Sequence, residues 1–469
     1  VSPSAVANVQ DIVELVRQRA REVPEGEWIQ GFGYRQEHLT EGRPPRHWEL
    51  DAAAPNHPVT LGHQSGHIIV VNSLALKLAG ITVNTPDMFD GQHGLIVKDP
   101  TSGEPNGELR EAACSRVRRL LPAPGIDELI TSAHETLLRY AAEGITTVHD
   151  AAVRLPDAAI AYQRAAAEGK LPIRIVMMFA GESLPGVTRG EGGDVGLRTG
   201  FGNDRLKVGS VKLWADGSIQ GYSGALTEDY FTDPGNRGIL QYDPEELNSR
   251  VMRLHEAGFQ IAIHGNGDRA IDCILDAYEA ALKTHPNADH RHRIEHCQMV
   301  RDDQLERMAS LGVLASFFAK HVYYWGDEHR DIFIGPERGS RISPLRSARS
   351  RGVRFGLHSD NAVTPVAPLE GIWCAVNRVT SSGKVLGPEQ CLTVEEALRA
   401  YGLDAAYLGH DEDRLGSIEV GKLADLVVLD RNPFEVDPMD LRNIGIARTI
   451  VGGEEIYRAS DLETGGRGE

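Results

Sequence analysis

The chain has 469 residues, of which 41% are hydrophobic and 25% are charged, an ordinary composition for a globular protein. Its formal net charge of −18 at pH 7 argues against nucleic acid or an anionic membrane as the main partner, because both repel a strongly acidic protein. The sequence contains no run of about 18 apolar residues, so a membrane span is not predicted.

Residues 1–120 do not show the regular alternation of strands and helices that follows them. A helix is predicted over Ser4–Glu22, and a short apolar run follows at Pro58–Val71. This run could be a strand of the main sheet. However, the Gln64-Ser65-Gly66 break and the non-helical residues after it favour an inserted subdomain.

Between residues 121 and 405, short β-branched runs alternate with amphipathic helices, which is typical of βα units around a parallel sheet. Seven strands are predicted, over Gly144–His149, Ile173–Phe179, Val208–Trp214, Phe259–His264, Arg291–His296, Val313–Phe318 and Val353–His358. Helices are predicted over Asp127–Glu143, Pro244–Ala257, Ala270–Lys283 and Asp302–Leu311. Because a TIM barrel has eight strands, the predicted fold is α/β, a (β/α)8 barrel with one strand, interpreted as the first, unaccounted for.

Residues 406–469 change to short, glycine-punctuated strands. These are predicted over Gly416–Glu419, Ala424–Leu429 and Arg448–Val451, with a tight turn at Gly452-Gly453-Glu454. Three short strands cannot form a sandwich core alone. We therefore predict that they complete a small β-sandwich whose other strands precede the chain.

Four chemically active side chains are predicted at strand ends, namely Lys212, His264, His296 and Asp360. Catalytic residues of a TIM barrel converge at the C-terminal edge of its strands, and two imidazoles with a carboxylate suit Zn²⁺ or a similar borderline ion. Each residue alone has a plainer explanation as a polar cap, a snorkelling lysine or a turn residue. Asp268 in particular is interpreted as the N-cap of a helix that begins at Arg269.

These residues lie within an ordered set of longer motifs. The motifs are S-G-H at 65–67, N-G-E-L-R-E at 106–111, K-L-W-A-D-G-S at 212–218, H-G-N-G-D-R-A-I-D at 264–272, H-R-I-E-H-C-Q at 292–298, H-S-D at 358–360 and L-G-S-I-E-V-G-K-L-A-D-L-V at 415–427. The set resembles the amidohydrolase superfamily, specifically the amidohydrolase family 3 branch that includes N-substituted formamide deformylase-like enzymes. The similarity covers nearly the whole chain.

The resemblance implies a divalent metal cofactor, zinc, as one or two ions. It implies that Lys212 is carboxylated to a carbamate bridging two metals, and that His264 and His296 bind the second metal. Asp360 would contact a metal, take a proton from bound water and pass it to the leaving nitrogen. His149 and His358 are interpreted as supporting residues, not as ligands.

The N-terminal part departs from the family pattern. The family's first strand ends in His-x-His, which holds the first metal, and no such pair precedes Ser4–Glu22. The literal match His290-Arg291-His292 begins the strand that ends at His296, and four residues of strand span about 13 Å, so it is predicted at the opposite end of the barrel. We therefore interpret the chain as N-terminally incomplete.

Three residues are predicted to contact substrate, namely His67, Tyr222 and His321. By resemblance, His67 lies in a substrate-side insertion, and His63 is a weaker candidate for a metal ligand. Tyr222 belongs to a long segment after the Lys212 strand, and His321 opens an aromatic run after the next-to-last strand. The plainer alternative is that aromatic loop residues pack a lid without touching substrate.

The predicted function is hydrolysis of a non-peptide carbon–nitrogen bond, of the amide or N-formyl type, in a small molecule. The alternative is a non-catalytic or regulatory relative with an incomplete metal site. Five scattered cysteines without a C-x-x-C pair argue against a disulfide framework and predict a cytoplasmic location. The sequence leaves the substrate and the oligomeric state, including a homodimer, undetermined.

Overall fold

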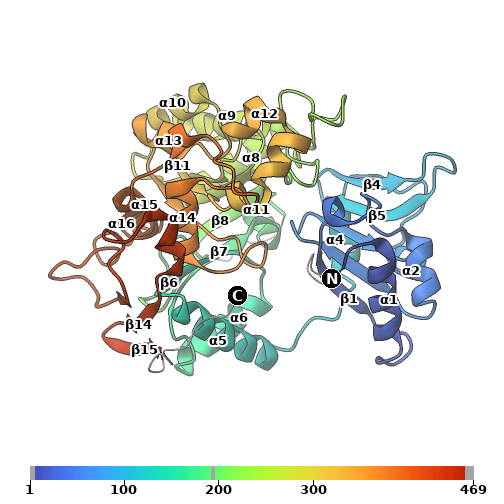
Figure 1. Ribbon diagram of the computed structural model, residues 1–469, viewed down its shortest axis with the longest axis horizontal. Coiled ribbons are helices and arrows are strands. Elements are labelled where there is room, and N and C mark those ends of the chain that lie inside the picture. The colour runs from blue at the N-terminus through green and yellow to red at the C-terminus, as the bar shows by residue number, and fades with distance from the viewer. Residues whose placement is uncertain (1–5, 192–195, 460–469) are drawn as a thin grey trace. The chain divides into compact units, whose positions relative to one another are not determined.

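The computed structural model describes residues 6–191 and 196–459 and divides into two compact units (Figure 1). The first unit comprises Val1–Ala123 with Asp216–Asp243, and the second comprises Pro124–Ala215 with Pro244–Glu469. Each unit is built around its own β-structure.

The first unit contains a five-stranded mixed sheet with the order β1-β2-β3-β5-β4. Its strands are β1 (Ile29–Tyr34), β2 (Val59–His63), β3 (Ile68–Val71), β4 (Gly94–Lys98) and β5 (Pro105–Glu111). β1 and β2 pair in parallel, and the other pairs are antiparallel. The apolar run Pro58–Val71 thus supplies two strands of this sheet and is not a strand of the parallel sheet in the second unit.

The helices of the first unit are short, and the longest of them covers the apolar core. They are α1 (Val9–Ala20), η1 (Gln36–His38), α2 (His47–Ala53), α3 (Ser73–Leu78) and α4 (Ala112–Arg118). α1 buries an apolar stripe at helical spacing, formed by Val9, Ile12, Val13 and Val16, into a core that includes residues of β1 and β2. The helix predicted near the N-terminus is therefore present, although Ser4 lies outside the described residues.

The second unit contains a curved, seven-stranded parallel sheet with the order β12-β11-β10-β9-β8-β7-β6 (Figure 1). Its strands are β6 (Thr147–Val153), β7 (Arg174–Ala180), β8 (Leu206–Trp214), β9 (Ile261–Gly265), β10 (Arg293–His296), β11 (Leu314–Phe317) and β12 (Phe355–Leu357). All seven predicted strands are confirmed. In the described part of the chain β6 and β12 form the two edges, so the sheet corresponds to seven strands of a TIM-type barrel.

Helices follow most of these strands. They are α5 (Ile126–Ala142), α6 (Asp157–Ala167), η2 (Gly181–Ser183), α7 (Pro185–Thr188), α8 (Pro244–Glu256), α9 (Asp268–Thr284), α10 (Asp302–Leu311), α11 (His321–Glu328), the π-helical turn η3 (His329–Phe333), α12 (Gly335–Ser340), α13 (Leu345–Ser350), α14 (Pro368–Asn377), η4 (Pro388–Gln390), α15 (Val394–Tyr401) and α16 (Leu403–Leu408). The capping role predicted for Asp268 is wrong. Gly267 is the N-cap of α9, and Asp268 is its first residue, whose carboxylate pairs with Arg301 at 3.3 Å.

The C-terminal strands form a separate antiparallel sheet of β13 (Leu426–Leu429), β14 (Ile446–Val451) and β15 (Glu454–Arg458), with the short helix η5 (Pro438–Asn443) between β13 and β14. The strand predicted over Gly416–Glu419 is wrong. The Lys422 ammonium donates to the carbonyls of Glu412 and Leu415 and to the Ser417 hydroxyl, which holds this segment as a loop. β15 was not predicted, because its five residues, E-E-I-Y-R, do not alternate between charged and apolar side chains.

Candidate active site

The predicted residues of the second unit lie at the C-terminal ends of its strands. Lys212 is in β8, His264 in β9 and His296 in β10, while Asp360 follows β12. The parallel register places Trp214 beside His264 and His264 beside Glu295. The sheet thus brings three of these four side chains to adjoining strands, and Asp360 lies beyond β11 from them.

The rings of His264 and His296 pack against each other. Their ring centroids lie 4.5 Å apart at an interplanar angle of 72°, and both residues are buried. The Nε2 atom of His264 lies 3.1 Å from Nδ2 of Asn266. Burial, reinforced by the neighbouring His264, lowers the pKa of His296 far below its usual range. A neutral imidazole keeps a lone pair that can bind a metal ion.

The second histidine of the pair is oriented by residues on β11 and just after β12. The Nδ1 atom of His296 lies 3.1 Å from Nε2 of His358. The Nδ1 atom of His358 in turn lies 2.8 Å from the Ser316 hydroxyl, and its ring stacks on Phe318 with centroids 5.3 Å apart. His358 therefore contacts a predicted ligand directly and links three strands.

Lys212 is buried beside an aromatic ring. Its Nζ atom lies 4.6 Å from the ring centroid of Trp214. Burial lowers the pKa of Lys212 to about 8, against the opposing effect of the carboxylates of Glu295 and Asp360. A larger fraction of this amine is therefore neutral near pH 7 than for an exposed lysine.

A buried ion pair on β10 lies near these residues. The Nε atom of Arg293 and Oε1 of Glu295 are 2.6 Å apart, with side chains 4% and 8% exposed. Burial alone would raise the pKa of Glu295, but the charges of Arg293, His358 and Lys212 outweigh it and lower the pKa to about 2. This pair was not predicted from the sequence, although the R-x-E spacing on a strand that ends in a predicted ligand places both charges on one face.

Asp360 differs from the other three residues because it is exposed and lies on a turn with φ +49°. Within residues 6–191 and 196–459, no three His, Cys, Asp or Glu side chains come close enough to hold a metal ion. The structure thus pairs His264 with His296, but it does not bring Asp360 into a three-residue group with them. Each of these donors is nevertheless of a type that zinc accepts.

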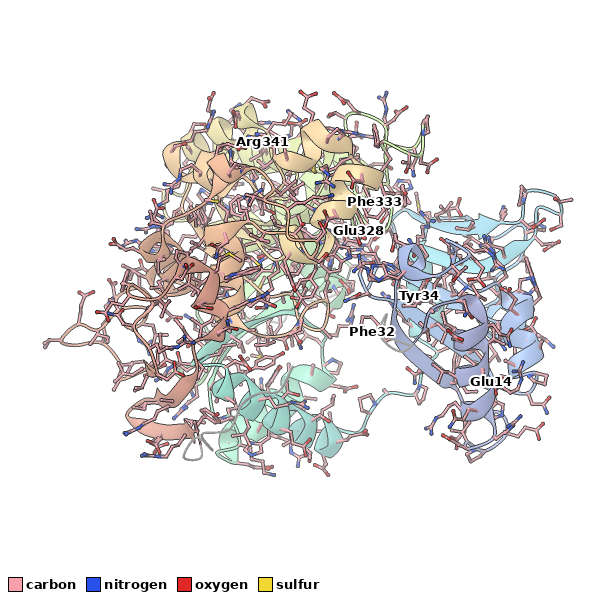
Figure 2. All side chains as sticks on the ribbon, in the orientation of Figure 1. Glu14, Phe32, Tyr34, Glu328, Phe333 and Arg341 are labelled. Atoms are coloured by element: carbon pink, nitrogen blue, oxygen red, sulfur yellow. The ribbon has the colours of Figure 1, made fainter. Side chains whose placement is uncertain are left out.

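His321 is the first residue of α11 and is fully buried. Its ring lies 6.2 Å from that of His296 and 4.4 Å from that of Phe318. Its Nδ1 atom has no hydrogen-bond partner among the residues that the structure describes. α11 continues into η3, which ends at Phe333 (Figure 2), and π-helical turns of this kind are frequent at functional sites.

The remaining predicted residues belong to the first unit. The Nδ1 atom of His67 lies 2.9 Å from Oε2 of Glu111. The hydroxyl of Tyr222 lies 3.2 Å from that of Thr232. His63 is buried in β2, and its Nδ1 atom lies 2.8 Å from the Ser65 hydroxyl.

Comparison with known proteins identifies the family. A family model described as "Amidohydrolase family" matches residues 1–457. The N-substituted formamide deformylase of Arthrobacter pascens is 32% identical over 459 residues, which are 96% of this chain and 83% of that protein. The chain belongs to the amidohydrolase family. This amidohydrolase is also 30% identical over 472 residues to the putative amidohydrolase YtcJ of Bacillus subtilis, which covers 97% of this chain and 85% of that protein.

A solved structure agrees with this assignment. The fold of this amidohydrolase matches that of an uncharacterized metal-dependent hydrolase from Pyrococcus horikoshii with a TM-score of 0.70 and 26% identity, covering 92% of this chain and 82% of the other. The predicted resemblance is confirmed, and so is the class of enzyme, a hydrolase of carbon–nitrogen bonds other than peptide bonds. In the part of the chain that the structure describes, no helix combines the length and the apolar character needed to cross a membrane.

Proposed function

We propose that this amidohydrolase is a metal-dependent hydrolase that cleaves an amide or N-formyl bond in a small molecule. The observation that carries the proposal is the buried pair of His264 and His296 at the C-terminal ends of neighbouring strands. We also propose a cytoplasmic location, because all five cysteines are free thiols.

The donors at these strand ends fit a divalent metal, for which we propose zinc as one or two ions. His264 and His296 would hold it, and Asp360 would complete the set. The Lys212 amine, with a pKa of about 8, is poised to attack CO₂, forming a carbamate and releasing one proton. A bound zinc ion would lower the pKa of water to roughly 7 and polarise the substrate carbonyl.

The chain's own residues would perform the proton transfers. Asp360 accepts a proton from the attacking water and returns it to the leaving nitrogen, so that an amine and a carboxylic acid are released. His358 holds the His296 ring in place through its contact at Nδ1. His67, Tyr222 and His321 are proposed to contact the substrate.

The proposal is tested by metal analysis and by hydrolysis of a panel of N-formyl and N-acyl amines, with protein expressed from its full reading frame. We expect bound zinc and turnover of at least one compound. His264→Gln should lose both metal and turnover. His134→Gln, at a histidine on α5 whose Nδ1 contacts the Lys170 carbonyl, should keep both.

The opposite result would favour the regulatory alternative. A protein that is fully folded, binds no metal and hydrolyses none of the panel would overturn the proposed function. Metal binding that is equally strong in His264→Gln and in the unmodified protein would remove the histidine pair from the metal site.

A further inference from the structure

A carboxylate–imidazole pair in the first unit lies outside the proposed metal-ligand set. Oε2 of Glu111 is 2.9 Å from Nδ1 of His67, and the side chains are 1% and 16% exposed. The backbone N–H of Glu111 also donates to the His67 carbonyl at 2.9 Å. The two residues, which belong to separate sequence motifs, are thus joined at both backbone and side chain.

The Glu111 carboxylate determines which nitrogen of the His67 imidazole carries the hydrogen. An ionised carboxylate only accepts hydrogen bonds, so Nδ1 of His67 carries a hydrogen. In the neutral ring Nε2 is then an acceptor. The same Oε2 atom accepts from Nε2 of Gln241 at 2.8 Å, and this amide also donates to the Asp216 carbonyl at 3.0 Å. The amide thereby ties Glu111 to the turn that follows β8 in the chain.

The conformation of Glu111 lowers the stability of the fold in two ways. Glu111 has φ +51°, in the region that favours glycine. Its Oε1 atom is buried without a hydrogen-bond partner among the described residues. A Cβ atom at position 217 would lie 2.0 Å from that oxygen, so any larger residue there would displace the Glu111 carboxylate. Strained backbone and buried polar atoms without partners are concentrated at functional sites.

We propose that Glu111 is a positioning residue that fixes the Nδ1–H tautomer of His67 and so presents Nε2 of His67 to the substrate as a hydrogen-bond acceptor. The contact with substrate rests on the function proposed above. The tautomer itself follows from contacts within the first unit alone.

The tautomer is measured by NMR of protein labelled with [15N]histidine, with the His67 signals assigned through His67→Gln. We expect the Nδ1–H form in the unmodified protein and a mixture of tautomers in Glu111→Gln, because a glutamine can present either its oxygen or its nitrogen. Glu14→Gln on α1, where the side chain is 58% exposed (Figure 2), should leave the His67 signals unchanged.

The spectrum of the unmodified protein is decisive even if Glu111→Gln does not fold. An Nε2–H tautomer for His67 would overturn the inference. The inference would also be overturned if a folded Glu111→Gln variant gave the same His67 signals as the unmodified protein.

Activity provides an independent measurement. We expect Glu111→Gln to lower kcat/KM about 10- to 100-fold, a typical effect for a residue that orients a functional histidine. The double variant with His67→Gln should be no worse than His67→Gln alone, and the melting temperature of Glu111→Gln should change little. Losses that add in the double variant would overturn the positioning role. Absence of hydrolysis by the unmodified protein would overturn the proposed function and leave the tautomer assignment standing.

Discussion

Asp360, for which we propose the proton-transfer role, lies just after the end of its strand. β12 ends at Leu357, and the chain then turns through Asp360 with φ +49°. The carboxylate is exposed, yet its charge acts on both Lys212 and His358. A carboxylate in this position can exchange protons with water while remaining electrostatically coupled to buried groups.

Replacing Asp360 with asparagine removes the ability to carry a proton but preserves the shape of the side chain. We expect the variant to lower kcat by about 10²- to 10⁴-fold, the usual contribution of a general acid or base. It should retain bound metal, because His264 and His296 are unchanged. The measurement is kcat together with metal content, and near-normal kcat would remove Asp360 from the proton-transfer role.

At the scale of elements, a chain of histidines joins α8, β9 and β10 at the N-terminal edge of the sheet. The backbone N–H of Ile261 donates to Nδ1 of His292 at 3.1 Å, and Nε2 of His292 lies 2.9 Å from Nδ1 of His255. Nε2 of His255 lies 2.6 Å from the His285 carbonyl. Since Nδ1 of His292 accepts, its ring is neutral and donates through Nε2. The His-x-His sequence at 290–292 thus lies at the end of β10 opposite to His296, as predicted.

This histidine chain predicts acid sensitivity. Burial, with the charges of His290 and His255, holds the pKa of His292 well below its usual range. Below about pH 6.5 the unfolded chain therefore binds a proton that the native state does not. As the pH is lowered further, the free energy of unfolding decreases by about 1.4 kcal/mol per pH unit for each such histidine. Urea unfolding at pH 7.5 and 5.5 measures this slope.

His292→Asn tests the origin of the slope, because its Oδ1 atom can accept from Ile261 but cannot titrate. The difference in unfolding free energy between the two pH values should shrink by about the contribution of one histidine, ~1 kcal/mol. His285→Asn, at an exposed side chain, should leave the slope unchanged. An identical slope in His292→Asn would contradict the explanation.

At the scale of the whole molecule, a buried ion pair connects the C-terminal sheet to the parallel sheet of the same unit. Arg174, the first residue of β7, contacts both carboxylate oxygens of Asp425 at 2.8 and 2.7 Å. Their side chains are 6% and 4% exposed. The Asp425 carboxylate also accepts from the backbone N–H of Gly452 in the β14–β15 turn. The Thr449 hydroxyl adds a second link by donating to the Ala141 carbonyl at the end of α5.

Removing one partner of this pair leaves a buried charge unpaired. We expect Asp425→Ala to lower the free energy of unfolding by about 3–5 kcal/mol, measured by urea unfolding. Limited proteolysis should cut first within β13–β15. Glu455→Gln removes an exposed pair with Arg458 and should cost less than about 1 kcal/mol. Equal losses of unfolding free energy in the two variants would show that the buried pair does not stabilise the attachment of the sheet.

The sequence by itself determined the seven parallel strands and the strand ends that carry Lys212, His264 and His296. Both are local properties, because β-branched runs and the residue that closes each run are read within a few positions. The same local signals misplaced a strand at Gly416–Glu419, where a lysine that bonds backbone carbonyls outweighs strand propensity.

Tertiary structure alone decided which side chains meet. His296 contacts His358 from 62 residues away, and His67 contacts Glu111 from 44 residues away. No local pattern encodes such pairs, because they depend on sheet order and on the burial that removes competing water. The ordered motifs that include these strand ends therefore pointed to an amidohydrolase and to His358 as a supporting residue, whereas the atoms that His358 and Glu111 contact emerged only from the folded chain.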